Sequence, residues 1–395
     1  MNTRTGAITR RSALATVAAA AAFPRPALAS GVVKVGLIAP MTGPFTSTGR
    51  VMAAGAKLYL DEKGDTVAGR KVELVVKDDT GNADTAKRIA QEMVVNGEAQ
   101  ILAGFGLTPI ALAVAPIATQ TKTAQVIMLA ATPVITERSP FIVRASFTTA
   151  QTTVPIADWS LQNGVKRVVT LVSDYAPGHD IEVNYVNRFK AGGGQILESI
   201  RVPLANRDFA PFLQRVADAK PDALFVFVPA GVGAQLIKQY VERGLDKSGI
   251  RLLGEGSVTE DDIIGQMGDA ALGMITSHHY SAAHDSPENK AFVAAYRKAN
   301  DNARPNLTSV AAYDSMHLIF EALKKTGGDP AGEKLVEAMK GVAWISPRGP
   351  VSIDPETREP IQNIYLRKVE RVGGELYNVE FHTIPNYKDP SKAKS

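Results

Sequence analysis

Short apolar runs alternate along the chain with longer segments in which apolar residues recur every three or four positions. The run at 32–39 is mostly apolar, as is typical of a strand that is covered on both faces. The segment 49–63 then places Met52, Ala56 and Tyr59 at helical spacing. This alternation of short strands with amphipathic helices predicts parallel sheets with helices on both faces.

The pattern divides the chain into two such series followed by a helical return. The first has expected strands at 32–39, 71–77, 101–103 and 126–129, with helices at 49–63, 83–95 and 109–119. The second has expected strands at 167–172, 196–202, 223–228, 251–253 and 273–277, with helices at 153–162, 179–190, 209–219 and 232–243. Helices follow at 287–298, 309–324 and 333–339, and strands at 360–372 and 375–381. Because 395 residues exceed one usual core, we expect an α/β protein with two Rossmann-like lobes.

The first 29 residues have the pattern of a secretory signal peptide. Arg4, Arg10 and Arg11 precede an apolar run at 13–22, and Ala27-Leu28-Ala29 matches a small-residue cleavage site. Such a short run cannot cross about 30 Å of hydrocarbon as a permanent helix. We expect cleavage after about Ala29 and a periplasmic location, by the Sec route or, since 9–14 resembles a twin-arginine signal, after folding. The alternative is a disordered cytosolic tail.

Charge and cysteine content restrict the partners. The formal net charge is +4, and the leader alone holds four arginines and no acidic residue, so the remaining chain is close to neutral. A nucleic-acid partner therefore loses its electrostatic support. The absence of cysteine excludes a disulfide framework, a thiolate metal site and a lipid attached at the cleavage site. Since no later apolar run approaches 18 residues, we expect no direct membrane anchor.

Several strand ends carry distinctive segments. The strand at 32–40 leads into Met41-Thr42-Gly43-Pro44, and further segments follow in order at 74–80, 104–118 with 130–133, 174–178 and 254–256. In this order and spacing the sequence resembles the type I periplasmic solute-binding proteins, in particular the branch that binds branched-chain amino acids and amides. The resemblance covers residues 31–385.

The resemblance implies a fold and a role. It implies an N-terminal lobe of 30–148 plus 279–350 and a C-terminal lobe of 149–278 plus 351–395. Three crossing segments, near 147–151, 277–280 and 347–353, would form a hinge around a ligand cleft. Proteins of this family pass their ligand to the permease of an ABC importer and perform no chemistry. Open α/β sheets bind ligands at the carboxyl ends of their strands, so the site is expected in the loops that follow them.

The loop at 104–109 is the expected carboxylate subsite. Thr108 fits a helix N-cap and Pro109 the first helical position. A helix N-terminus offers unpaired N–H groups and partial positive charge, and the resemblance places the ligand carboxylate here, beside Phe105 and Leu107. Since Leu107 stands where relatives often have serine, backbone N–H groups and the Thr108 hydroxyl are the expected donors. Alternatively, Thr108 only caps the helix.

Other site residues follow from the same resemblance. Ala130, through its backbone, and Thr132, through its backbone or hydroxyl, would give a second carboxylate contact, although 130–133 could be an ordinary turn. In the second lobe Tyr175 would close over the ligand, and Ala230 would leave room for a bulky one. Further candidate walls are Phe45, Phe147 and Tyr313, each of which could instead belong to a core.

Glu255 lies between two glycines at the end of a strand. The resemblance implies that a carboxylate here pairs with the ammonium group of an amino acid. It could equally be a solvated loop charge. Arg144 follows an apolar strand near the first crossing and is interpreted as a structural ion pair or hinge residue.

Motifs for catalysis or metal binding are not found in the sequence. Gly231-Val232-Gly233 lacks the third glycine of a dinucleotide fingerprint, and no phosphate-binding P-loop run occurs. His278-His279 lacks the H-E-x-x-H spacing, and no G-x-S-x-G elbow is present. We therefore expect no cofactor, no metal and no enzymatic activity; an exported enzyme is the disfavoured alternative.

The ligand class depends on Glu255. If its carboxylate faces the cleft, an amino acid is favoured; if it turns away, small residues near Ala230 and aromatic walls suit a benzoate-like or cinnamate-like acid. We favour the aromatic acid slightly, with a branched-chain or other amino acid next. A ligand sensor that feeds a receptor or regulator is the alternative to transport.

Overall fold

The computed structural model describes Met1 and residues 31–204, 208–229 and 232–393. The signal peptide predicted at 1–29 therefore lies, apart from Met1, outside the described residues, as does Ala230. Contacts group Gly31–Ser395 into one unit, and the following description concerns that unit.

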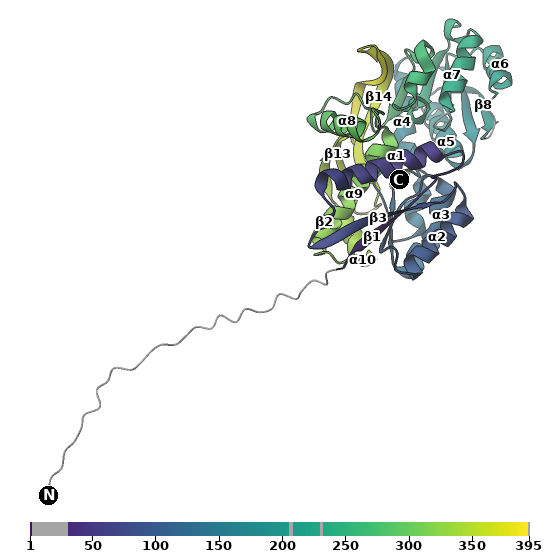
Figure 1. The fold of residues 1–395 in the computed structure, drawn as a ribbon. Coiled ribbons are helices and arrows are strands. Elements are labelled where there is room, and N and C mark those ends of the chain that lie inside the picture. Colours follow the sequence, from purple (N-terminus) through teal and green to yellow (C-terminus); the bar gives the residue numbers. More distant parts are fainter. Residues whose placement is uncertain (2–30, 205–207, 230–231, 394–395) are drawn as a thin grey trace. The chain divides into compact units, whose positions relative to one another are not determined.

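Six strands form the sheet of the N-terminal lobe, in the order β2-β3-β1-β4-β5-β6 (Figure 1). They are β1 (Val33–Ala39), β2 (Thr66–Val67), β3 (Arg70–Asp78), β4 (Ile101–Gly104), β5 (Ala124–Ile127) and β6 (Ile142–Arg144). All neighbours are parallel except β2 and β3. Val35 and Leu37 of β1 enter one core and Ile38 enters the other, which explains why this strand is mostly apolar.

Helices cover both faces of this sheet. One face carries α1 (Thr46–Lys63), α8 (Pro287–Ala299), α9 (Leu307–Lys325) and α10 (Gly332–Met339), and the other carries α2 (Ala83–Val95) and α3 (Thr108–Thr121). Although they are far apart in sequence, α1 and α9 pack side by side, as the purple and green helices of Figure 1 show. The helical return after β11 thus completes the first lobe.

Nine strands form the second sheet, in the order β12-β13-β14-β11-β10-β9-β7-β8, with β15 also paired to β14. They are β7 (Arg167–Asp174), β8 (Gln195–Pro203), β9 (Ala223–Phe227), β10 (Arg251–Glu255), β11 (Ile275–His278), β12 (Ala343–Ser346), β13 (Gly349–Ile353), β14 (Pro360–Val372) and β15 (Glu375–Tyr387). Strands β7 to β11 are parallel and the last four add antiparallel pairs. The helices of this lobe are α4 (Thr149–Gln162), α5 (Ala176–Ala191), α6 (Ala210–Ala219) and α7 (Gly233–Glu242). Short 3-10 helices lie at Pro133–Arg138, Leu245–Lys247, Gly256–Thr259, Ile264–Ala271 and Pro390–Lys392.

Each sheet contains a point at which the strand order reverses. In the first sheet the chain passes from β1 to β3 on one side and then to β4 on the other. In the second sheet it passes from β7 to β8 and then to β9 on the opposite side. Loops that leave two such neighbouring strands diverge and leave a crevice at the carboxyl edge of the sheet. The α/β fold class with two Rossmann-like sheets is confirmed.

Buried arginines connect the segments that cross between the lobes. Arg348 donates to the carbonyls of Ala145 (2.5 Å) and Ser146 (2.8 Å) in the first crossing. Arg367 donates to the carbonyls of Tyr280 and Gly256, and so ties the second crossing to the second sheet. Both guanidinium groups are fully buried. Water therefore competes little for their hydrogen bonds to the backbone carbonyls.

The third predicted crossing, at 347–353, overlaps a hairpin that the sequence pattern did not indicate. Strands β12 and β13 pair with each other, and β13 joins the second sheet through β14. Ile353, however, packs in the core of the first lobe. The lobe boundary predicted between residues 350 and 351 therefore falls within β13.

Candidate ligand-binding site

Loops from both switch points meet around a cavity with about 690 Å³ of empty space, its mouth included. The lining comes from both lobes and comprises Phe45, Thr48, Gly106, Leu107, Thr108, Leu129, Ala130, Ala131, Phe147, Thr149, Tyr175, Pro177, Ile181, Phe227, Pro229, Glu255, Ser257 and Glu260. Seven of the eleven predicted site residues are among them: Phe45, Leu107, Thr108, Ala130, Phe147, Tyr175 and Glu255.

The N-terminus of α3 supplies hydrogen-bond donors to the cavity. Leu107, not Thr108, is the N-cap, and Thr108 is the first helical residue, so its hydroxyl does not cap the helix. That hydroxyl lies 3.0 Å from the Thr132 hydroxyl, and either oxygen can be the donor of this hydrogen bond. Within the described ranges, no protein group accepts from the N–H groups of Gly106, Leu107 and Thr108. Together with the helix dipole, these donors suit an anion.

The backbone N–H of Ala130 is not free to bind a ligand, contrary to the prediction. Phe105 has a left-handed backbone (φ 67°), its N–H donates to Ile38 and its carbonyl accepts from the N–H of Ala130 (3.0 Å). The Ala130 N–H is therefore engaged and is not the expected carboxylate donor, although Ala130 lines the cavity. The ring of Phe105 is buried in the core beneath the loop and does not reach the lining. Thr132 is also absent from the lining and contacts it through Thr108.

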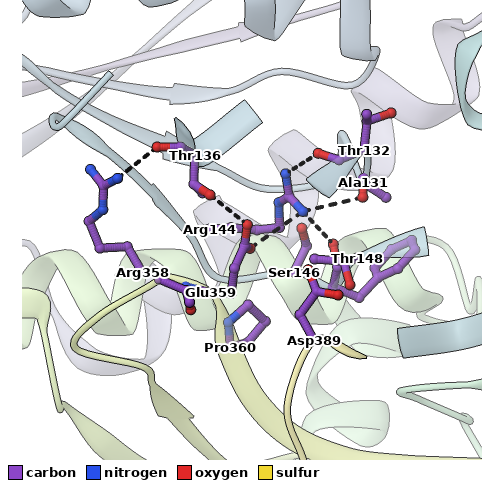
Figure 2. Close-up of polar contacts among 12 residues, drawn as sticks. Ala131, Thr132, Thr136, Arg144, Ser146, Thr148, Arg358, Glu359, Pro360 and Asp389 are labelled. Carbon is purple, nitrogen blue, oxygen red and sulfur yellow. Dashed lines mark hydrogen bonds and ion pairs between the residues drawn. The ribbon is translucent and has the colours of Figure 1, made fainter. Parts of the chain in front are cut away.

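Arg144 holds the loop that follows β5, as Figure 2 shows. Its guanidinium is fully buried and donates to the carbonyls of Thr132 (2.7 Å) and Ala131 (3.2 Å). It also lies 3.4 Å from the buried carboxylate of Glu359, which accepts a hydrogen bond from Thr136. This is the structural ion pair expected from the sequence, and it places the Arg144 guanidinium behind the loop at Ala131 and Thr132.

Thr149 is a lining residue that the sequence analysis missed. It is the first residue of α4 and is 1% exposed, and its hydroxyl has no hydrogen-bond partner in the part of the chain that the structure describes. A buried hydroxyl without a partner is unfavourable unless a ligand or water supplies one. The pattern Thr148-x-x-Gln151, which forms a capping box here, could have revealed that α4 begins at this position.

Glu255 forms the polar end of the cavity in the second lobe. It is fully buried, so it is not a solvated loop charge. One carboxylate oxygen accepts from the N–H of Ser257 (2.9 Å), and the other lies 3.0 Å from Nε2 of His278. Burial raises the pKa of Glu255, but His278 and Ser257 outweigh it and hold the pKa below the usual value. Gly256 is required beside it, since a Cβ there would lie 2.1 Å from the Arg367 guanidinium.

A second carboxyl group, Glu260, was not predicted. Burial, and then the neighbouring carboxyl groups led by Asp262, raise its pKa well above the usual value. The Asn306 side chain donates to Glu260 over 2.7 Å. Because Asn306 caps α9 of the first lobe, this contact joins the lobes beside the cavity.

Aromatic rings line the remaining walls. Phe45 and Phe147 come from the first lobe and its crossing, and Tyr175 and Phe227 from the second. The Tyr175 and Phe227 rings are stacked with centroids 6.0 Å apart. Burial, and then Glu255 and Glu260, raise the pKa of Tyr175, so its hydroxyl remains a donor.

Tyr313 does not reach this site. Its ring packs edge-on against Tyr59 in the core of the first lobe, and its hydroxyl donates to Glu62 (2.7 Å). The prediction that Tyr313 is a cavity wall is therefore corrected, because this position belongs to the interface between α9 and α1. Pro229 lines the cavity, whereas Ala230 beside it lies outside the described residues.

Within 31–204, 208–229 and 232–393, no three His, Cys, Asp or Glu side chains are arranged to hold a metal ion. In the same residues, no helix has the length and apolar character needed to cross a membrane.

A cavity enclosed by the switch-point loops of two α/β lobes defines a two-lobed solute-binding protein. The chain belongs to the periplasmic binding protein family, whose sequence model matches residues 32–375. The predicted family and its type I fold are thus confirmed.

Some relatives are named for amino acids, and others have structures with a bound aromatic acid. The chain is 45% identical to the Leu/Ile/Val-binding protein homolog 6 of Brucella melitensis biotype 1, over 96% of each chain. Two solute-binding proteins of ABC transporters from Rhodopseudomonas palustris have similar structures, each with a TM-score of 0.89. That of strain BisB5, in complex with 3,4-dihydroxybenzoic acid, is 58% identical and is matched over 92% of this chain and 99% of its own. That of strain HaA2, in complex with p-hydroxybenzoic acid, is 42% identical over 92% and 100%.

Proposed function

We propose that this protein is the periplasmic solute-binding component of an ABC importer and that its ligand is a hydroxylated aromatic carboxylate. The observation that carries the proposal is the polarity of the cavity: hydrogen-bond donors at the first lobe, aromatic walls, and an ionised acceptor at the second lobe. The similarity to the two proteins with bound hydroxybenzoic acids supports the same ligand class.

The ligand carboxylate would bind at the N-terminus of α3. Unpaired N–H groups, the Thr108 hydroxyl and the positive end of the helix dipole stabilise an anion there. The buried cation of Arg144 adds to the positive potential from behind the loop. In the second lobe, Glu255 would repel a carboxylate and accept a hydrogen bond, so the ligand would have one favourable orientation.

An amino-acid ligand is the competing possibility, since Glu255 could pair with an ammonium group and a relative is named for leucine, isoleucine and valine. In an α-amino acid, however, the ammonium and carboxylate groups are attached to one carbon. A hydroxybenzoate separates its two polar groups by a ring, and four aromatic side chains line the cavity. The ring therefore fits the walls better.

Delivery to the permease would follow export and closure. The protein would lose its leader after about Ala29, remain without a lipid anchor because it has no cysteine, and diffuse in the periplasm. Contacts that the ligand makes with both lobes at once, and only in the closed form, would favour that form once ligand is bound. The protein would bind its ligand without chemical change, in accordance with its membership of a binding-protein family.

A ligand panel tests the proposal. Thermal unfolding and calorimetry of the purified protein with 4-hydroxybenzoate, 3,4-dihydroxybenzoate, benzoate and leucine should reveal tight binding of the two hydroxylated acids. At 100 times its Kd a ligand adds about 2.7 kcal/mol to the free energy of unfolding. Stabilisation by leucine without stabilisation by the aromatic acids would overturn the proposed ligand class.

Replacing Thr149 by valine is expected to weaken binding of 4-hydroxybenzoate about tenfold or more. The reason is the loss of a hydrogen bond from a buried hydroxyl to the ligand carboxylate, worth ~1.5–3 kcal/mol. Calorimetric titration measures the change. Thr153 is the matched control, because its hydroxyl on the same helix is equally buried and without a partner in the described ranges but does not line the cavity. Equal losses for T149V and T153V would show that Thr149 does not bind the ligand.

A further inference from the structure

Two consecutive histidines lie behind the cavity wall. His278 ends β11 and His279 begins the second crossing, and both are fully buried. The His278 ring meets Phe147 edge-on (centroids 4.6 Å apart), and the His279 ring stacks on the same phenyl group (4.9 Å). Phe147 lines the cavity, whereas neither histidine does. The pair thus adjoins both the site and the hinge.

His278 differs from His279 in its polar contact. Nε2 of His278 lies 3.0 Å from one oxygen of Glu255, without the alignment of a hydrogen bond. For His279, neither ring nitrogen has a hydrogen-bond partner in the residues that the structure describes. Only His278 can therefore act on the carboxylate that faces the cavity.

The Glu255 carboxylate is incompletely satisfied. Its Oε2 accepts from the N–H of Ser257, whereas its Oε1 has no aligned donor in the described part of the chain and lies 3.0 Å from Nε2 of His278. A buried carboxylate oxygen without a donor costs free energy that a hydroxyl group can recover. Since Glu255 lines the cavity, a ligand can supply that hydroxyl.

We propose that His278 is a positioning residue for ligand selection: it holds Oε1 of Glu255 where a ring hydroxyl of the ligand donates to it, and so favours hydroxylated over unsubstituted aromatic acids. This inference rests on the proposed function. A benzoate without a hydroxyl would leave Oε1 buried and without a hydrogen bond. Polar sites reject ligands that lack the matching polar group for this reason.

Several ionisable groups surround the contact between Glu255 and His278. The groups that face it are Glu260 and Tyr175 around Glu255, and Arg367, Arg348 and His279 around His278. Burial lowers the pKa of His278 and the two arginines add to this effect, while Glu255 opposes it. The neutral imidazole is therefore the favoured form, and its Nε2 is the ring nitrogen that lies beside the carboxylate of Glu255. The backbone at Gly256 packs closely against His278, since an added Cβ would lie 2.7 Å from the Cβ of His278.

Three variants and two ligands test the inference. Calorimetry would give the ratio of the Kd of benzoate to that of 4-hydroxybenzoate for the wild-type protein and for H278L, H278Q and H279L. In H278L the ratio is expected to fall about tenfold, the factor that corresponds to one lost hydrogen bond. In H278Q it should largely persist, because a glutamine amide can occupy the place of Nε2. In H279L, the control with the same burial and a contact with the same phenyl ring, the ratio should be unchanged.

The outcomes separate this inference from the proposed function. An unchanged ratio in H278L, or an equal fall in H279L, would overturn the role of His278 while the wild-type protein still bound 4-hydroxybenzoate. Failure of the wild-type protein to bind either aromatic acid would overturn the proposed function itself, and the inference with it. Circular dichroism establishes that each variant folds; if H278L does not fold, H278N, whose amide is too short to reach Oε1, replaces it with the same expected fall.

Discussion

Replacing Arg144 by methionine is expected to lower the free energy of unfolding by about 3 kcal/mol. The substitution leaves Glu359 buried without its guanidinium partner and removes the donors from the carbonyls of Ala131 and Thr132. Breaking one side of a buried ion pair costs ~3–5 kcal/mol. We expect the lower end of this free-energy range because Lys392 and Thr136 still contact Glu359. Urea denaturation followed by circular dichroism measures the loss.

The control for this prediction is an exposed arginine in the same lobe. Arg138 ends the 3-10 helix at Pro133–Arg138 and is exposed, so R138M should change the free energy of unfolding by no more than ~0.5 kcal/mol. The double variant R144M/E359Q should regain part of the loss, because it removes the uncompensated buried charge. A loss below 1 kcal/mol in R144M would contradict the assigned role of Arg144.

The largest expected effect on binding follows replacement of Glu255 by methionine. This change keeps the length of the side chain and removes the acceptor at the second-lobe end of the cavity. The Kd of 4-hydroxybenzoate should rise about 10- to 150-fold, which corresponds to the ~1.5–3 kcal/mol of a hydrogen bond to a charged group. The affinity for benzoate should change little, since benzoate has no hydroxyl to donate.

Thr108 provides the matched comparison for Glu255. T108V removes a hydroxyl at the carboxylate end, and both ligands carry a carboxylate, so their affinities should fall by the same factor. Titration of both ligands into both variants distinguishes the two ends of the site. If E255M weakened benzoate and 4-hydroxybenzoate equally, the assignment of Glu255 to the ring hydroxyl would be incorrect.

Local signals made much of the fold predictable. The range predicted for α2 was confirmed at both ends, because Asn82 caps the helix with its side chain. The last hairpin was predicted because Gly373 and Gly374 separate two alternating runs. The start of α4 was predicted four residues late, because the prediction did not use the capping box formed by Thr148 and Gln151. The β12–β13 hairpin was missed because its pairing with β14 depends on residues distant in the sequence.

The site was predictable where it depends on strand-end loops. Thr108 follows β4 at the switch point of the first sheet and Glu255 ends β10 of the second, and the structure brings both to the cavity. Tyr313 was predicted wrongly because an aromatic residue at helical spacing faces a core or a site according to tertiary packing alone. The hydrogen bond from the N–H of Ala130 to Phe105 could not be predicted from the sequence either, because it depends on the left-handed backbone of Phe105. Glu260 was missed because it belongs to a short irregular segment without periodicity.

A crystal structure of the protein grown with 4-hydroxybenzoate tests the central claim most directly. The account predicts one molecule between the lobes, with its carboxylate at the N–H groups of residues 106–108 and its hydroxyl within hydrogen-bond distance of Oε1 of Glu255. An amino acid retained from the expression host in place of the aromatic acid, with its ammonium group on Glu255, would contradict it.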